Sequence, residues 1–127
     1  MIARLGIIIL LILVLTVSLS PVGCRPAPIL GEPVRRGKAE NGTYEGTFRS
    51  WPNRAVVNVT IVNGLITDVR IVSHWASSIG RKAEQIIPRR IIEKQSTNVD
   101  AVSGATNSSR VIMNAAQNAI EKSYGSQ

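Results

Sequence analysis

The sequence predicts a small α+β domain, in which an antiparallel sheet of three or more strands is followed by helices. Residues 43–73 contain segments with the alternating pattern of strands, and two of them flank Asn63-Gly64, the strongest short signal for a β-hairpin. Apolar residues recur at the helical period near the C-terminus. The chain has 127 residues, so it holds one domain at most. We place that domain at residues 42–124.

Three segments are rich in strand-forming residues. Residues 43–48 alternate between the two faces of a strand, and residues 55–62 read AVVNVTIV, with Val57, Val59 and Ile61 on one face. Trp51-Pro52-Asn53 between them is typical of a turn. Residues 65–73 form the return strand after the hairpin. Together these segments predict a three-stranded antiparallel meander.

Two helical regions follow the strands. Residues 81–87 predict a short helix, and Pro88 is expected in the first turn of a new helix that continues to Gln95, because proline lacks the N–H that an interior position needs. The last helix is the clearer one, with an apolar face formed by Val111, Ile112, Ala115, Ala116, Ala119 and Ile120. Its expected N-cap is one of Asn107, Ser108 and Ser109.

The N-terminus has the pattern of an export signal. A positively charged start is followed by an uncharged apolar core at residues 5–19, which is shorter than the roughly 20 residues of a spanning helix. Cys24 then follows Gly23 and resembles the lipidated cysteine of a bacterial lipobox, although Pro21 stands where that motif usually has leucine. We expect a signal peptide at 1–23, a lipidated tether at 24–41 and an anchor on the extracytoplasmic face of a bacterial membrane. The alternative is an uncleaved signal anchor.

Composition excludes several classes of function. The single cysteine cannot form a disulfide within the chain, and Cys24 with His74 cannot supply the four ligands of a structural zinc site. The net charge of +7 is scattered, which favours an ordinary basic surface over a polyanion-binding patch. Aromatic residues make up 4% of the chain, too few for base stacking, so we expect no nucleic-acid partner. Any redox chemistry must come from an organic cofactor.

A hydroxyl-rich loop precedes the last helix. Ser103, Gly104 and Thr106 stand where free backbone N–H groups and the helix dipole favour a phosphate, and glycine permits a close backbone approach. The alternative is a capping segment that binds nothing, because serine and threonine are ordinary residues before a helix.

The segment Asp100-Ala101-Val102-Ser103-Gly104-Ala105-Thr106, with Ser109, resembles the flavinylation motif of the FMN-binding domain family. The resemblance implies that FMN is joined to the hydroxyl of Thr106 by a phosphoester bond, which a separate flavin transferase makes from FAD with Mg²⁺. It implies that Asp100, Ser103, Gly104, Ala105 and Ser109 belong to the cofactor site. The resemblance extends over residues 41–122, through Asn41-Gly42-Thr43-Tyr44, Asn63-Gly64 and Gln95-Ser96.

One segment departs from the family pattern. Where relatives often have a Glu-Thr-Pro-Gly-like stretch near the flavin, this chain has His74-Trp75-Ala76-Ser77-Ser78-Ile79-Gly80. His74 and Ser78 are therefore candidate cofactor contacts, and a surface position is the alternative for His74. Either Trp75 or Trp51 is a candidate to pack on the ring, with a plain core position as the alternative.

The expected function is a membrane-tethered, extracytoplasmic flavoprotein that relays electrons between upstream and downstream redox proteins. We expect an electron carrier rather than a stand-alone enzyme. Its expected partners are the membrane, a flavin transferase and redox proteins. The alternatives are a lipoprotein that binds or senses flavin non-covalently, and a small flavin-dependent reductase.

Overall fold

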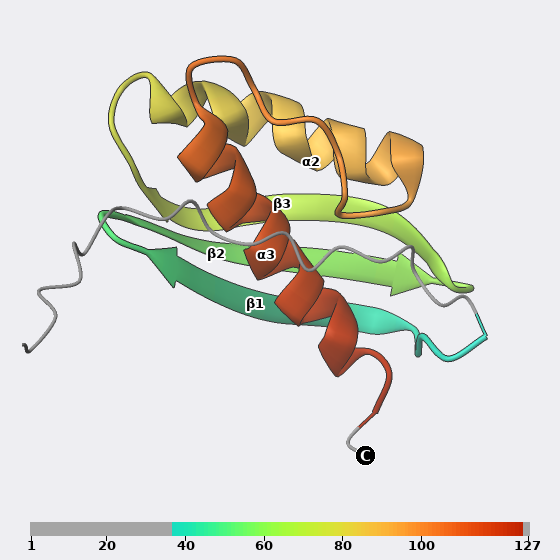
Figure 1. Ribbon diagram of the computed structural model, residues 1–127. Coiled ribbons are helices and arrows are strands. Elements are labelled where there is room, and N and C mark those ends of the chain that lie inside the picture. Colours follow the sequence, from blue (N-terminus) through green and yellow to red (C-terminus); the bar gives the residue numbers. More distant parts are fainter. Residues whose placement is uncertain (1–36, 126–127) are drawn as a thin grey trace, which may run out of the picture.

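The computed structural model describes residues 37–125 (Figure 1). The predicted signal peptide, Cys24 and most of the predicted tether lie outside these residues. Strands β1 (Gly42–Ser50), β2 (Asn53–Val62) and β3 (Leu65–Trp75) form one antiparallel sheet in the order β1-β2-β3. The predicted α+β class and the three-stranded meander are therefore confirmed. Within residues 37–125, no helix combines the length and hydropathy that a transmembrane span requires.

Both long helices cover the same face of the sheet (Figure 1). The short 3₁₀ helix η1 (Gly80–Lys82) leads into α2 (Ala83–Lys94), which lies against β3, whereas α3 (Thr106–Lys122) crosses β1 and β2. Alternate residues of β2 are fully buried beneath the helices, and the predicted apolar face of α3 is fully buried against them. This one-sided arrangement leaves the other face of the sheet uncovered by the helices.

The hairpin between β2 and β3 has the conformation that Asn63-Gly64 predicts. Both residues have positive φ, 52° for Asn63 and 72° for Gly64, as a two-residue turn that matches the twist of the strands requires. The side-chain oxygen of Asn41 also accepts a hydrogen bond from the N–H of Asn63 at 2.7 Å. The local chemistry of these two residues is sufficient to set the turn.

The prediction of a helix break at Pro88 is wrong, because α2 runs without interruption from Ala83 to Lys94. Proline inside a helix costs about 3 kcal/mol, since it removes a hydrogen bond and crowds the preceding turn. Ala83, Ile87 and Ile91 recur at the helical period and are fully buried on one face of α2. Burying a large aliphatic side chain gains roughly 1.5–3 kcal/mol, so the continuous apolar stripe outweighs the single lost bond.

Gly46 allows α3 to lie unusually close to β1. A Cβ atom at this position would collide with the carbonyl oxygen of Ala115 and the backbone nitrogen of Ala119. The small residues of α3 and the glycine of β1 thus let the two backbones approach each other. This contact sets the distance between α3 and the sheet.

Side chains form hydrogen bonds with backbone groups of both edge strands of the sheet. Lys122 Nζ donates to the carbonyl of Glu45 at 2.6 Å, and Asn118 Nδ2 donates to that of Thr47 at 2.9 Å, both on β1. On β3, the amide of Gln95 pairs with both backbone groups of Ile66, accepting from its N–H at 2.8 Å and donating to its carbonyl at 2.9 Å.

Candidate functional site

The candidate site is the segment that joins α2 to α3 and ends at the first turn of α3. The segment begins at Gln95, whose φ of 54° ends α2 and whose side chain attaches it to β3. Further along, the hydroxyl of Thr97 is fully buried and donates to Gln117 Oε1 on α3 at 2.6 Å. Arg90 Nη1 donates to the carbonyl of Asp100 at 2.6 Å. The loop is therefore attached to β3, α2 and α3 before it reaches the motif.

Ser109 closes the motif loop onto α3. Its buried hydroxyl accepts from the N–H of Val102 at 3.0 Å and donates to the carbonyl of Ala105 at 2.8 Å. The N–H of Ala105 in turn donates to the carbonyl of Val102 at 2.9 Å. The small loop over residues 102–105 is thus held in one conformation by the side chain of a residue inside the helix.

The predicted N-cap is wrong. Helix α3 begins at Thr106, its N-cap position is Ala105, and no side chain caps it. Ser108 and Ser109 are buried within the first turn, and the hydroxyl of Ser109 has its partners in the loop instead. The N–H groups of the first turn have no partner within a helix, so this uncapped end presents donors to an anion.

The structure places Ser103, Gly104, Ala105 and Thr106 at this helix end, whereas Asp100 lies beside α2, where its carbonyl accepts from Arg90. Asp100, Ser103, Gly104 and Thr106 are exposed, whereas Ala105 is buried. Gly104 has a φ of +78°, a conformation that residues with a Cβ rarely adopt. Thr106 is therefore an accessible hydroxyl on the first residue of α3, carried by a loop that turns sharply just before it.

Two side chains near Thr106 have buried polar atoms without a hydrogen-bond partner. They are Asn107, through Oδ1, and Arg110, through Nε. Arg110 lies one helical turn after Thr106 and so on the same face of α3. A guanidinium donor and free backbone N–H groups suit a phosphate, so the residues present fit the phosphate end of FMN. Sequence reasoning missed Arg110, although its i, i+4 spacing from Thr106 was a usable signal.

The segment that departs from the family pattern lies against the motif. A Cβ on Gly80 would collide with Ser108 Oγ, and one on Gly104 would lie 3.7 Å from Ile79 Cγ2. Ile79 is 55% exposed, so an apolar side chain borders the motif at the surface. Ser78 is exposed in the same segment. Sequence reasoning did not single out Ile79, because its contact with Gly104 joins parts of the chain that are distant in sequence.

His74 does not have the surface position that was its alternative. Its side chain is 1% exposed, and Nδ1 lies 2.9 Å from Glu84 Oε1 in the first turn of α2. Nε2 is buried without a partner. Both tryptophans are exposed, so the alternative that Trp51 or Trp75 belongs to the core is also wrong.

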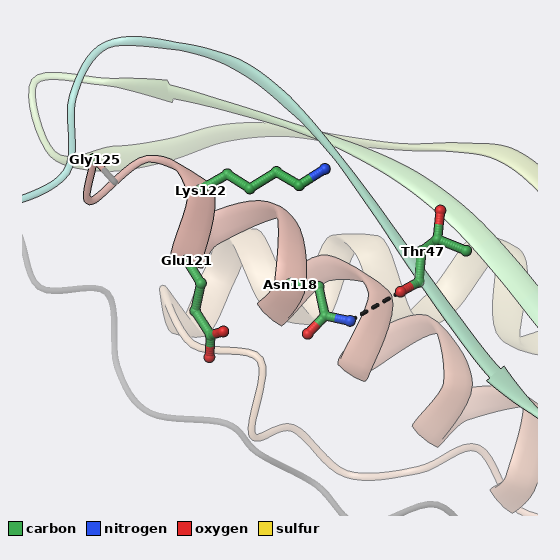
Figure 2. A pocket seen from close by; sticks show the side chains of 5 residues that line it. All are labelled: Thr47, Asn118, Glu121, Lys122 and Gly125. Carbon is green, nitrogen blue, oxygen red and sulfur yellow. Dashed lines mark hydrogen bonds between the residues drawn. The ribbon is translucent and has the colours of Figure 1, made fainter. Parts of the chain in front are cut away.

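A surface hollow at the other end of α3 is a poor candidate for the flavin phosphate, because its polar side chains are already engaged. It measures about 630 Å³ and is lined by Thr47, Asn118, Glu121, Lys122 and Gly125 (Figure 2). Asn118 and Lys122 already donate to β1 carbonyls, and Glu121 accepts from Gln117. Glu121 lies about 22 Å along the helix from Thr106. A second hollow, of about 320 Å³, borders the motif itself, because Asp100 is in its lining together with Arg90 and Lys94.

Comparison with known proteins identifies the family to which the chain belongs. The FMN-binding domain matches residues 52–121, which include the whole motif. NADH:acrylate oxidoreductase of Vibrio harveyi is 32% identical over 89 residues, covering 69% of this chain but only 9% of that protein. The crystal structure of the CPE2226 protein from Clostridium perfringens has the same fold, with a TM-score of 0.55 and 18% identity over 67% of this chain and 88% of the other. The match to the domain covers more than half of the chain, and the chain belongs to the FMN-binding domain family.

Proposed function

We propose that the protein is an extracytoplasmic, membrane-tethered electron carrier with FMN linked covalently to Thr106. The observation that carries the proposal is the position of Thr106, an exposed hydroxyl on the first residue of an uncapped helix, within the motif. A phosphoester at this hydroxyl puts phosphate where the helix dipole and free N–H groups stabilise negative charge.

The surrounding residues have separable roles in this proposal. The uncapped N–H groups and Arg110 hold the phosphate, Gly104 permits the turn that presents Thr106, and Ser109 fixes that turn. Exposed Asp100 and Ser103 are available for recognition by the transferase. When bound, FMN supplies the electron chemistry, while the protein supplies position and electrostatics.

The relative from Vibrio harveyi supports a role in electron transfer, since its name describes an NADH-dependent redox reaction. The chain spans only 9% of that protein, so we extend to this chain the handling of electrons and not the reduction of acrylate. The donor and the acceptor are then separate redox proteins.

Intact mass spectrometry tests the covalent link. After co-expression with a flavin transferase, the protein should gain the mass of FMN minus water and keep its flavin after denaturation. Thr106→Ala should remove the adduct without unfolding the domain, because alanine suits an early helical position. Thr106→Ser should retain some adduct, since an alcohol remains. Ser103→Ala is the matched control, because it removes an exposed neighbouring hydroxyl.

The outcomes separate the alternatives. An adduct on Ser103 would move the site and keep the function. Flavin that binds but is lost on denaturation would favour a non-covalent or sensory module. Reduction of a soluble acceptor by the purified protein alone, with NADH, would favour the small reductase.

The membrane tether needs a test of its own. The protein should fractionate with membranes and incorporate labelled fatty acid, and Cys24→Ala should abolish the labelling. Unchanged labelling and processing of Cys24→Ala would reject the lipoprotein proposal. Unlabelled protein that still sediments with membranes would favour the uncleaved signal anchor.

A further inference from the structure

Both tryptophans of the chain lie at one end of the sheet. Trp51 is in the turn between β1 and β2, and Trp75 is the last residue of β3, directly opposite Arg54 in the register. They are 72% and 76% exposed. Exposed tryptophans that stand close to arginines are the composition of an interface rather than of an ordinary surface.

The arginines at this end face each other rather than an acidic residue in the sheet register, and Glu84 approaches from α2, where it contacts His74. Arg49 pairs with Arg54 across β1 and β2, and Arg49 Cζ lies 5.9 Å from the centre of the Trp51 ring. Like charges that face each other across strands destabilise a sheet. The sequence has no acidic residue from Gly46 to Thr67 or from Val69 to Ala83. We name Arg49, Trp51, Arg54 and Trp75 the Trp/Arg patch.

A hollow accompanies the patch. It measures about 240 Å³ and is lined by Arg54, Ser73, His74 and Trp75. Arg54 in its wall suits a carboxylate side chain of a partner, because the guanidinium can bind both of its oxygens. Glu84 contacts His74 at this hollow, so the positive charge of the patch is that of Arg49 and Arg54 on the sheet.

The patch lies near the candidate flavin site. After Trp75 the chain passes through the segment in which Ile79 borders Gly104 and Gly80 abuts Ser108. The end of β3 and the start of α3 therefore lie at the same end of the molecule (Figure 1), while Arg54 alternates with the buried residues of β2 and so faces away from the helices. The chain enters the sheet at Gly42, at the opposite end of β1, about 30 Å from this turn.

We propose that the Trp/Arg patch is the docking surface for an acidic surface of another protein. That this partner exchanges electrons rests on the proposed function, since the patch lies at the same end of the molecule as the motif. We commit to a protein because a guanidinium binds both oxygens of an acidic side chain, and two arginines face each other here. An anionic lipid surface is the outcome that the experiment must separate.

The experiment uses the full chain without flavin, in nanodiscs of phosphatidylcholine. With excitation selective for tryptophan and a nanodisc scaffold protein that lacks tryptophan, the emission comes from Trp51 and Trp75, the two tryptophans of the chain. Poly-L-glutamate is the probe. We expect it to shift the emission to shorter wavelength, and we expect salt at about 0.5 M to reverse the shift by screening.

Two double variants with the same change in net charge make the comparison. Arg49→Gln/Arg54→Gln should raise the half-saturating concentration of the probe about tenfold. It should change stability little, since it removes a like-charge pair together with the contact between Arg49 and the Trp51 ring. Lys38→Gln/Arg89→Gln, which removes two exposed charges elsewhere, should bind as the unaltered chain does.

Three results would overturn the proposal. They are no shift with the probe, an equal loss in both double variants, and a shift in nanodiscs that contain phosphatidylglycerol without any probe, which would assign the patch to the membrane. Because the protein carries no flavin here, none of these results depends on the link to Thr106. Failure of the patch and failure of the proposed function therefore remain distinguishable.

Discussion

Thr106 and Arg110 lie one turn apart on the same face of α3, the first exposed and the second with a buried Nε that has no partner. An unpartnered cationic donor is costly unless something binds it. A phosphate on Thr106 would meet that need. A phosphate on the exposed hydroxyl of Thr106 would therefore lie within reach of the guanidinium of Arg110.

We expect Arg110→Gln to slow flavin attachment to Thr106. A hydrogen bond to a charged group contributes roughly 1.5–3 kcal/mol, so the rate should fall about tenfold or more. Intact mass measured over a time course with the transferase gives the rate. Arg89→Gln on α2 is the control, because Arg89 is exposed and its ion-pair distance to Glu93 is 4.0 Å. Equal rates for the two variants would remove Arg110 from the site.

Ser109→Ala should destabilise the domain by roughly 1–3 kcal/mol, since it leaves the N–H of Val102 without a partner. Ser108→Ala is the matched control at the next position, where a hydroxyl is also buried, and it should cost less than about 1 kcal/mol. Urea denaturation measures both. If the two variants were equally stable, Ser109 would not be what holds the loop.

Gly46→Ala should be one of the most destabilising small changes in the sheet. The added Cβ would collide with the backbone of α3 at Ala115 and Ala119, and such overpacking costs about 3 kcal/mol. Gly37→Ala, where nothing lies within 4 Å, should be neutral. Thermal unfolding provides the measurement, and similar melting temperatures for both variants would contradict the close approach.

Gly64→Val should cost about 1–3 kcal/mol, because it forces a β-branched residue to adopt positive φ. Gly64→Asn should be better tolerated, since asparagine enters the left-handed region more easily. The free energy of unfolding of each variant decides the point. Valine as stable as asparagine at this position would argue against the observed turn.

The parts of the fold that depend on neighbouring residues could be predicted from the sequence. Asn63-Gly64 sets its turn by its own backbone preference, and the apolar face of α3 follows from a repeat that needs no partner to be recognised. The resemblance of residues 100–109 to a family motif was recognisable for the same reason, since these residues are nearly contiguous.

The parts of the fold that depend on contacts between distant residues could not be predicted from the sequence. Pro88 signals a helix break locally, but burial of Ile87 and Ile91 decides the outcome. Likewise, the hydroxyl of Ser109 is a competent cap by residue type, yet the loop at Val102 engages it. The contact of Ile79 with Gly104 depends on how the sheet and α3 are placed together, which no local pattern records.

The side chains that occupy the two edges of the sheet also affect how separate molecules meet. A free strand edge is a template on which another chain can add a strand, and this is a common route to aggregation. Here Lys122 and Asn118 engage carbonyls of β1, while Gln95 satisfies both backbone groups of Ile66 on β3. At these positions the backbone groups of the edge strands are already bonded and cannot pair with a strand of a second molecule.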